Sequence, residues 1–430
     1  MQLPHLFALI CLFVPIWAVL YWIVPHFTTY RHLKHIPGPF VSKFSNIWLA
    51  LGARRGQKFA WVDSAHRKYG KVVRVGFNHV SIATPEGLRT VYAHGNGFLK
   101  DAFVSGVPGV FNVRHRGEHT RKRKIIAHTF SPGAVQDFES HMADNLRRWV
   151  AQLDRIVAYP GPDGFARINM MPWCTFLAFD IIGDLAFGAP FGMVDRGRDE
   201  CESTLPGKPK TYVPEAETLN RRGEVNSTLS LLPKIRPFAK YLPDPFFSKG
   251  LQSVTNLHGI AEAAVTKRLE GSEKETLTER RRHDILDMLC RGKDGDGNPM
   301  PKGRAGLRGP HPTHRGQRHC IQHSLCRGVL NLPGLQAELD AAIPADSLIA
   351  SHSMVKNLRF LRQCIDEGMR LHSTSAIGLP RIVTAARGVP TTTITSPKAL
   401  SFLFPATPSI TTQTSGDPMS RSFSPTAGSR

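Results

Sequence analysis

Residues 360–383, FLRQCIDEGMRLHSTSAIGLPRIV, carry the pattern that decides the fold. The first half places apolar residues at helical spacing with charged residues between them, which predicts an amphipathic helix over residues 357–371. On this helix Glu367 and Arg370 share one face, where a charge-assisted ion pair can form. Pro380-Arg381 follows on the C-terminal side. Because Glu-x-x-Arg pairs are common on solvated helices, the meaning of this one depends on the rest of the chain.

The residues upstream of this segment predict a mainly α fold with a small β-sheet. Residues 72–82, VVRVGFNHVSI, are rich in β-branched side chains and predict a strand. A helix is predicted over residues 118–130, which are dense in Arg and Lys. A second is predicted over residues 170–187 and ends at Gly188. Residues 271–282 are charged and polar, as in a surface linker.

The N-terminal region predicts a membrane anchor. Leu6 to Val24 is a run of 19 apolar residues. A helix of this length spans roughly 28 Å, close to the hydrocarbon thickness of a bilayer. A cleaved signal peptide is the rival interpretation, but it requires positive charge before the run, whereas Arg31 and Lys34 follow it. This bias predicts a single-pass helix with a cytosolic body, joined by a rigid spacer at Pro37-Gly38-Pro39.

The formal net charge of +21 is compatible with binding to nucleic acid or to an anionic membrane surface. Six Lys and Arg without any acid lie between Lys302 and Arg327, so part of this charge is confined to one unusual stretch. No nucleic-acid-binding motif is recognisable, and nucleic acid is therefore not predicted as a partner. Seven scattered cysteines indicate reduced thiols in the cytosol rather than a disulfide scaffold.

Taken together, these segments resemble the cytochrome P-450 superfamily of haem-thiolate monooxygenases. That superfamily has a Glu-x-x-Arg helix followed by a Pro-Arg strand, and an N-terminal anchor followed by a Pro-rich hinge. Residues 118–135, EHTRKRKIIAHTFSPGAV, resemble its basic helix. Residues 179–193, FDIIGDLAFGAPFGM, are similar to a segment of fungal members, especially the benzoate para-hydroxylases. The resemblance covers residues 1–300 and 330–385.

The resemblance implies a haem cofactor that is held by His119, Arg123 and Arg381. The two arginines would pair with the haem propionates, and His119 is a candidate hydrogen-bond donor. Glu367 and Arg370 would form a structural ion pair beside the haem. No catalytic side chain and no protein metal ligand is assigned.

The resemblance also implies the reaction and the partners. The expected reaction is the hydroxylation of a small aromatic acid, as in benzoate para-hydroxylation, using O2 and electrons from an NADPH-dependent reductase. The expected location is the endoplasmic reticulum membrane, with the body on the cytosolic side. The partners expected of the intact form are therefore the reductase, the aromatic acid and the membrane.

The chain departs from the family at two places. The family's cysteine lies in a Phe-x-x-Gly-x-Arg-x-Cys-x-Gly loop on the C-terminal side of the Pro-Arg strand, whereas the last cysteine here, Cys364, precedes Glu367. The oxygen-binding helix, with its Ala-Gly-x-Asp-Thr motif, is absent where residues 303–327 stand. Because a thiolate opposite the oxygen favours O–O cleavage, this sequence is predicted to form no thiolate-ligated haem and to be inactive.

A shifted reading frame explains both departures. Residues 314–320, HRGQRHC, can be encoded as CAT CGC GGG CAG CGA CAC TGC, which one base later reads Ile-Ala-Gly-Ser-Asp-Thr. In the tail, residues 422–429 read two bases later can give Phe-Gln-Pro-Asp-Arg-Trp-Leu, and residues 410–419 can give His-Asp-Pro-Asp-Glu-Trp-Gly-Pro-Asp. Both series resemble the family's sequence before the cysteine loop. We therefore hypothesise a misassigned intron, a sequencing error or a decaying gene.

The predicted fold is an incomplete cytochrome P-450-like fold with an N-terminal transmembrane helix, in five parts. These are an anchor and hinge (1–40), the N-terminal part of the monooxygenase domain (41–302), a shifted-frame segment (303–328), the Glu-x-x-Arg helix region (329–385) and a shifted-frame or disordered tail (386–430).

A non-catalytic metal-binding protein or a basic membrane-associated binding protein is the alternative function. Its basis is a tight cluster of possible zinc ligands, which comprises His314, His319, Cys320, His323 and Cys326. Structural zinc sites pair such residues at Cys-x2-4-Cys and His-x3-5-His spacings on ordered turns. The shifted reading frame explains the same residues with fewer assumptions.

Overall fold

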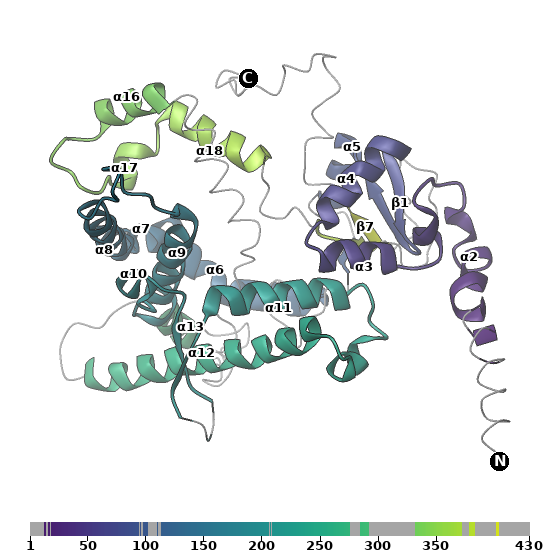
Figure 1. Ribbon diagram of the computed structural model, residues 1–430. Coiled ribbons are helices and arrows are strands. Elements are labelled where there is room, and N and C mark those ends of the chain that lie inside the picture. Colours follow the sequence, from purple (N-terminus) through teal and green to yellow (C-terminus); the bar gives the residue numbers. More distant parts are fainter. Residues whose placement is uncertain are drawn as a thin grey trace. The chain divides into compact units, whose positions relative to one another are not determined.

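The computed structural model (Figure 1) describes the chain in several stretches. The described residues are 13, 16–17, 19–93, 95, 98–101, 110, 113–205, 207, 209–275, 284–291, 332–371, 378–382 and 401–403. The chain divides into two compact units. Unit 1 comprises residues 1–105, 224–241 and 375–418, and unit 2 comprises residues 106–223, 242–374 and 419–430.

Unit 1 is built on a five-stranded sheet with the order β1-β2-β7-β6-β3. The strands are β1 (Val72–Gly76), β2 (His79–Ile82), β3 (Leu99–Lys100), β6 (Arg381–Ile382) and β7 (Ser401–Leu403). β1 and β2 form an antiparallel hairpin, which confirms the strand predicted over residues 72–82 and adds a turn within it. β7 lies parallel to β2, and β6 is antiparallel to both β7 and β3. Residues 381–382 and 401–403 therefore complete a sheet that begins near the N-terminus.

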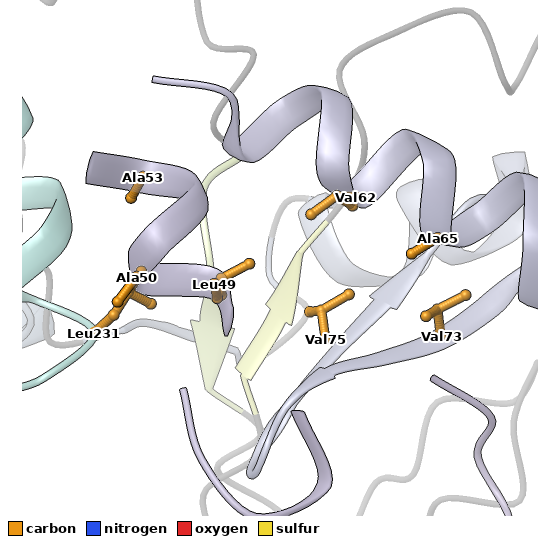
Figure 2. Packing of buried hydrophobic residues seen from close by; sticks show 8 residues of the cluster. All are labelled: Leu49, Ala50, Ala53, Val62, Ala65, Val73, Val75 and Leu231. Carbon is orange, nitrogen blue, oxygen red and sulfur yellow. The ribbon is translucent and has the colours of Figure 1, made fainter. Parts of the chain in front are cut away.

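The helices of unit 1 are η1 (Val19–Ile23), α2 (Val24–Phe27), η2 (Arg31–Leu33), η3 (Phe40–Lys43), α3 (Ile47–Arg54), α4 (Lys58–Tyr69), α5 (Pro85–Tyr92) and η5 (Arg236–Tyr241). Of these, η3, α3 and α4 pack against β1. Figure 2 shows Leu49 of α3 and Val62 and Ala65 of α4 on the side of Val73 and Val75 of β1, and Ala50 of α3 beside Leu231. A second cluster unites Leu33 and Ile36 with Val80 and Ile82 of β2. Because all four residues of β2 are buried, the strand is covered on both faces.

Unit 2 is mostly helical. Its helices are α6 (Arg116–Ala127), η4 (His128–Phe130), α7 (Pro132–Asp137), α8 (Glu139–Val157), α9 (Met170–Phe187), α10 (Met193–Arg196), α11 (Glu215–Leu229), α12 (Pro245–Glu275), α13 (Ile285–Arg291), α16 (Leu332–Ala342), α17 (His352–Val355) and α18 (Arg359–Leu371). Residues 224–229 of α11 are counted with unit 1. A short hairpin joins β4 (Cys201–Ser203) to β5 (Thr211–Val213). The mainly α fold with small sheets is thereby confirmed.

α9 is the central helix of the unit 2 core. The helix has the bounds predicted from the sequence. Asn169 caps its start, and Gly188, at a φ of +77°, ends it. Asp180 accepts hydrogen bonds from the backbone N–H groups of Met193 and Val194, at 3.0 and 2.9 Å. Among the helices that the structure describes, α9 alone is long and apolar enough to cross a membrane. Its two buried carboxylates and its packing on α8 identify it as a core helix instead.

Other predicted elements differ from the structure only at their ends. The helix predicted over residues 118–130 is α6 continued by η4, and the one predicted over residues 357–371 is α18. α18 begins at Arg359 because the Glu338 carboxylate accepts the N–H groups of Phe360 and Leu361, at 2.9 and 2.8 Å. The anchor predicted over Leu6–Val24 lies mostly outside the described residues. Residues 303–328 lie wholly outside them, and of the tail at residues 386–430 only β7 is described.

A buried ion pair joins α12 to α13. Arg268 Nε lies 2.5 Å from Asp284 Oδ2, and the two side chains are 8% and 1% exposed. Asp284 also accepts the N–H of Asp287 at 2.8 Å. Gly188 abuts the same pair, and a Cβ at this glycine would lie 2.8 Å from the Asp284 carboxylate. The end of α9 and the start of α13 therefore both pack against the Arg268–Asp284 ion pair.

Replacing Asp284 by alanine is expected to lower the free energy of unfolding by about 3–5 kcal/mol, because it leaves the buried Arg268 cation without its counter-charge. The matched control is Asp144→Ala, since Asp144 pairs with Arg147 at 2.6 Å on the surface, where both side chains are more than half exposed. That change is expected to cost less than about 1 kcal/mol. Urea unfolding measures both values, and equal losses would contradict the role of the buried pair.

A thiol and a carboxyl group are buried together where β4 meets α11. Cys201 Sγ donates to Glu215 Oε2 at 3.0 Å, and the two residues are 0% and 6% exposed. Burial raises the pKa of Glu215 to about 7, although the hydrogen bond from Cys201 lowers it. Asp199 and Asp180 raise this pKa further by their negative charges. Glu215 is therefore a neutral acid in the folded protein at mildly acidic pH.

The free energy of unfolding is expected to fall by about 3 kcal/mol between pH 4.5 and pH 7 through Glu215 alone. Across this range the folded protein keeps the Glu215 proton while the unfolded chain releases it, so rising pH favours unfolding. Glu215→Gln removes the titration but keeps a hydrogen-bond acceptor for Cys201. Chemical unfolding at a series of pH values compares the two proteins, and parallel curves would contradict the assignment.

Candidate functional site

Arg381 stands at the start of β6 with one buried donor unused. Its guanidinium lies 5.3 Å from the centre of the Tyr92 ring. The Tyr92 hydroxyl donates to the carbonyl of Leu379 at 2.5 Å, and burial raises its pKa, so the phenol stays protonated. Within the described part of the chain, Arg381 Nε is buried and has no hydrogen-bond partner. Arg381 is thus held in place with an N–H available to an acceptor from outside this part of the protein.

α6 carries the other two predicted haem-binding residues, His119 and Arg123. Glu118 forms a bidentate pair with Arg121, at 3.0 and 3.1 Å, and lies 3.9 Å from Lys122. The hydrogen bond from Arg121 is the main reason that the pKa of Glu118 is lowered. Arg123 is exposed and has no ion-pair partner among the residues described. Glu118, the acid of α6, therefore contacts Arg121 and Lys122 but not Arg123, which leaves the charge of Arg123 for another anion.

These observations test whether the predicted residues suit a haem. A haem presents two propionates, which need cationic hydrogen-bond donors. The buried unpartnered Nε of Arg381 and the unpaired cation of Arg123 meet that need in the described part of the chain. His119 is half-buried one turn before Arg123 on the same helix. The chemistry of these side chains suits propionate binding, but α6 brings together only His119 and Arg123, and Arg381 belongs to unit 1, so their shared role stays a prediction.

The predicted structural ion pair lies on α18. Glu367 is half-buried there and already engages in a contact, whereas the side chain of Arg370 lies outside the described residues. The pair therefore remains a prediction. The exposed side of the helix carries a surface ion pair between Arg362 and Asp366, at 2.8 Å.

Two supporting residues escape sequence reasoning. Tyr92 orients the strand that bears Arg381, but it is separated from Leu379 by 287 residues. Glu338 caps α18 from α16, more than 20 residues away. No local motif signals either contact, because both depend on tertiary packing between distant segments. A Tyr or a Glu at such a position has the same local pattern as any surface helix residue.

Metal binding by the predicted His and Cys cluster is not addressed by the structure. Residues 314–326, which contain that cluster, lie outside the described residues. In the stretches that are described, no three His, Cys, Asp or Glu side chains gather as a metal would require.

Comparison with known proteins extends over most of the chain. The cytochrome P450 family model matches residues 37–303 and 334–396. The benzoate 4-monooxygenase bphA of Aspergillus niger is 45% identical over 394 residues, which cover 87% of this chain and 74% of that protein. The cytochrome P450 monooxygenase FCK2 of Fusarium pseudograminearum is 26% identical over 365 residues, covering 82% and 60% of the two chains. The cytochrome P450 monooxygenase gsfF of Penicillium aethiopicum is 24% identical over 375 residues, covering 83% and 71%.

The family match includes the basic helix α6, the core helix α9 and the segment from α18 to Arg381, which are the segments that carried the resemblance in the sequence. Both the extent of this match and the 45% identity to a fungal relative lead to one conclusion. The chain belongs to the cytochrome P450 family.

Proposed function

We propose that this chain derives from a haem monooxygenase that hydroxylates benzoate or a closely related small aromatic acid at the para position. The observation that carries the proposal is the 45% identity to a benzoate 4-monooxygenase over 87% of the chain. The reaction would use O2 and electrons supplied by an NADPH-dependent reductase. We further propose that the chain with this sequence does not complete the reaction.

The residues of this chain account for cofactor binding rather than chemistry. Bound haem supplies the oxygen-activating chemistry of the family. Arg123 and Arg381 would neutralise its propionates, and His119 would contribute a hydrogen bond. Tyr92 holds Arg381 by lying against its guanidinium and by bonding to the carbonyl of Leu379. These contacts within the chain therefore fix the position of Arg381 independently of haem.

The missing step is the supply of a thiolate to the iron. No cysteine follows Cys364 in the sequence. The cysteines whose side chains the structure describes are Cys174, Cys201 and Cys364, and burial raises the pKa of each thiol. Cys201 in addition donates to Glu215, and the negative charge of Glu338 raises the pKa of Cys364. Each of the three is stabilised as a thiol, which is the form that does not bind iron.

The family match supports the shifted reading frame in part. It breaks off at residue 303 and resumes at residue 334, so it omits all but the first residue of the predicted segment 303–328. The second match ends at residue 396, so it includes residues 386–396 of the predicted tail and stops before the two tail segments whose shifted codons resemble the family. A chain that is homologous on both sides of residues 304–333 is the pattern expected when a short stretch is read in the wrong frame.

We also propose that the protein is held in the endoplasmic reticulum membrane by one helix within residues 6–24, with its body in the cytosol. Large apolar side chains in the described part of this segment are exposed, among them Phe13, Trp17 and Leu20. The rings of Trp17 and Tyr21 stack with centroids 5.1 Å apart, as suits aromatic residues near a membrane interface. Lys34 and Arg31 follow on the cytosolic side.

The carbon-monoxide difference spectrum of the reduced chain tests the loss of activity. The unaltered chain is expected to show no Soret band of the kind that marks thiolate ligation, because it has no cysteine after Cys364. The matched control is the coding sequence with the frame restored over both segments and continued in that frame through the family's cysteine loop, which is expected to show the band. A thiolate band from the unaltered chain would contradict the proposal, and its absence from both proteins would contradict the shifted frame.

Washing membranes at alkaline pH tests the anchor separately. The full chain is expected to stay with the membrane, whereas Leu12→Lys with Phe13→Lys is expected to be released, since each central charge costs about 2.5–3.5 kcal/mol. The charge-matched control places the same two lysines at Tyr159 and Phe165, which are 85% and 71% exposed, and is expected to stay. Release of all three proteins would show that the association is only electrostatic.

A further inference from the structure

Arg74 is a buried cation that contacts the N-terminal segment of unit 1. Arg74 of β1 is 0% exposed, and its guanidinium donates to the carbonyls of Phe77 and Lys43, at 2.6 and 3.0 Å. The carbonyl of Leu33 is 3.5 Å away. Burial lowers the pKa of Arg74 to about 10, which still leaves it protonated at neutral pH. Its positive charge is therefore stabilised by backbone dipoles.

The remaining hydrogen-bond partner is His26 of α2. Arg74 Nη1 lies 3.2 Å from His26 Nδ1, and His26 is 8% exposed. A guanidinium has donors and no acceptor. The bond therefore exists only when Nδ1 carries no proton, so His26 must be neutral with its proton on Nε2. A protonated His26 would place two donors and two positive charges against each other.

The described surroundings of His26 include no negative charge that would compensate a second positive one. Among the described residues, the charged groups that act on it are all cations, namely Arg74 of β1, Lys34 after η2 and Lys43 of η3. The rings of Phe27 and Phe44 lie against the imidazole, with centroids at 5.0 and 4.9 Å. Burial, and then the charge of Arg74, lowers the pKa of His26, although the backbone of Lys43 accepts a hydrogen bond that raises it.

We propose that His26 and Arg74 form a pH-sensitive latch, which holds α2 against the sheet while His26 is neutral and releases α2 when the imidazole takes up a proton.

The opening is confined to the residues up to the N–H of Tyr30, which donates to the carbonyl of Pro25. The segment that follows is fixed independently, since Arg74 N–H donates to the carbonyl of Pro37 at 2.8 Å and Ser42 Oγ donates to the carbonyl of Arg74 at 2.7 Å. Leu33 and Ile36 are buried in the core. Protonation therefore frees the chain that connects the preceding apolar segment to unit 1, while the sheet and the Pro-rich spacer keep their contacts.

The sign of the effect follows from the lowered pKa. The open form titrates near the ordinary histidine value of 6.5, and the closed form titrates below it. Above pH 6.5 both forms are neutral at His26 and the latch has its full strength. As the pH falls below 6.5 the open form gains a proton that the closed form resists, so the latch weakens. The body would then be tethered rigidly at neutral pH and loosely in acid.

Hydrogen–deuterium exchange of the full chain in lipid nanodiscs tests the latch. The informative amides are those of Thr28 and Tyr30, which donate to the carbonyls of Val24 and Pro25 at 3.1 and 2.9 Å. After correction for the intrinsic effect of pH on exchange, their protection is expected to fall between pH 8 and pH 5. The fall is about tenfold for each unit by which the latch lowers the pKa of His26.

Two variants separate the latch from other effects of acid. His26→Gln keeps an acceptor for Arg74 but does not titrate, so its protection is expected to be the same at both pH values. His35→Gln, at an exposed histidine nearby, is expected to behave as the native chain. Unchanged protection in the native chain, or an equal fall in the His26→Gln variant, would overturn the proposal.

Imidazole nitrogen chemical shifts of the native chain give a test that needs no variant. At pH 8 the Nδ1 of His26 is expected to resonate as an unprotonated nitrogen and the Nε2 as a protonated one. A proton on Nδ1 would overturn the proposal. The latch depends neither on haem binding nor on the reaction proposed above, so its failure would leave both unaffected.

Discussion

The burial of one positive charge, that of Arg74, organises unit 1. Its guanidinium bonds to carbonyls of Lys43 and Phe77 and to His26, which draws the N-terminal segment onto β1. β1 in turn pairs with β2, and the order of the sheet then leads through β7 to β6, where Arg381 stands. The position of the arginine proposed to meet a haem propionate is therefore set by the same sheet that the buried cation anchors. Losing the neutral partners of Arg74 would leave a buried charge without hydrogen bonds, which is among the more costly defects in a protein.

Features set by local sequence patterns were predictable. The bounds of α9, the strand signal in residues 72–82 and the helix that carries Glu367 follow from apolar periodicity, capping and β-branched composition. Contacts between distant segments were not predictable from such patterns. β7 pairs with β2 although more than 300 residues separate them, and the partners of Arg74 come from four different segments. One sequence contains no signal for such pairings, because register between distant strands is decided by packing.

The candidate site also combines residues that the sequence identified with contacts that only the structure shows. His119 and Arg123 were identified together because one helix carries both, and the resemblance to the family supplied their role. Arg381 was identified from Pro380-Arg381, but its support by Tyr92 appears only in the structure. The proposed loss of activity has a different basis, since it is a hypothesis about the coding sequence and not a feature of the described residues. Cys201 is buried and bonded to Glu215, and the half-buried Cys174 and Cys364 also have raised thiol pKa values, so none of the three is poised as an anion.

The nucleotide sequence that encodes residues 314–320 and 410–429 tests most directly whether this P450 has lost its oxygen-binding helix and thiolate through a change of reading frame. We expect the bases of the first segment, read one position later, to encode Ile-Ala-Gly-Ser-Asp-Thr. We expect those of the second, read two positions later, to encode the Phe-Gln-Pro-Asp-Arg-Trp-Leu series. Synonymous codons that yield no family-like residues in either shifted frame would contradict this explanation.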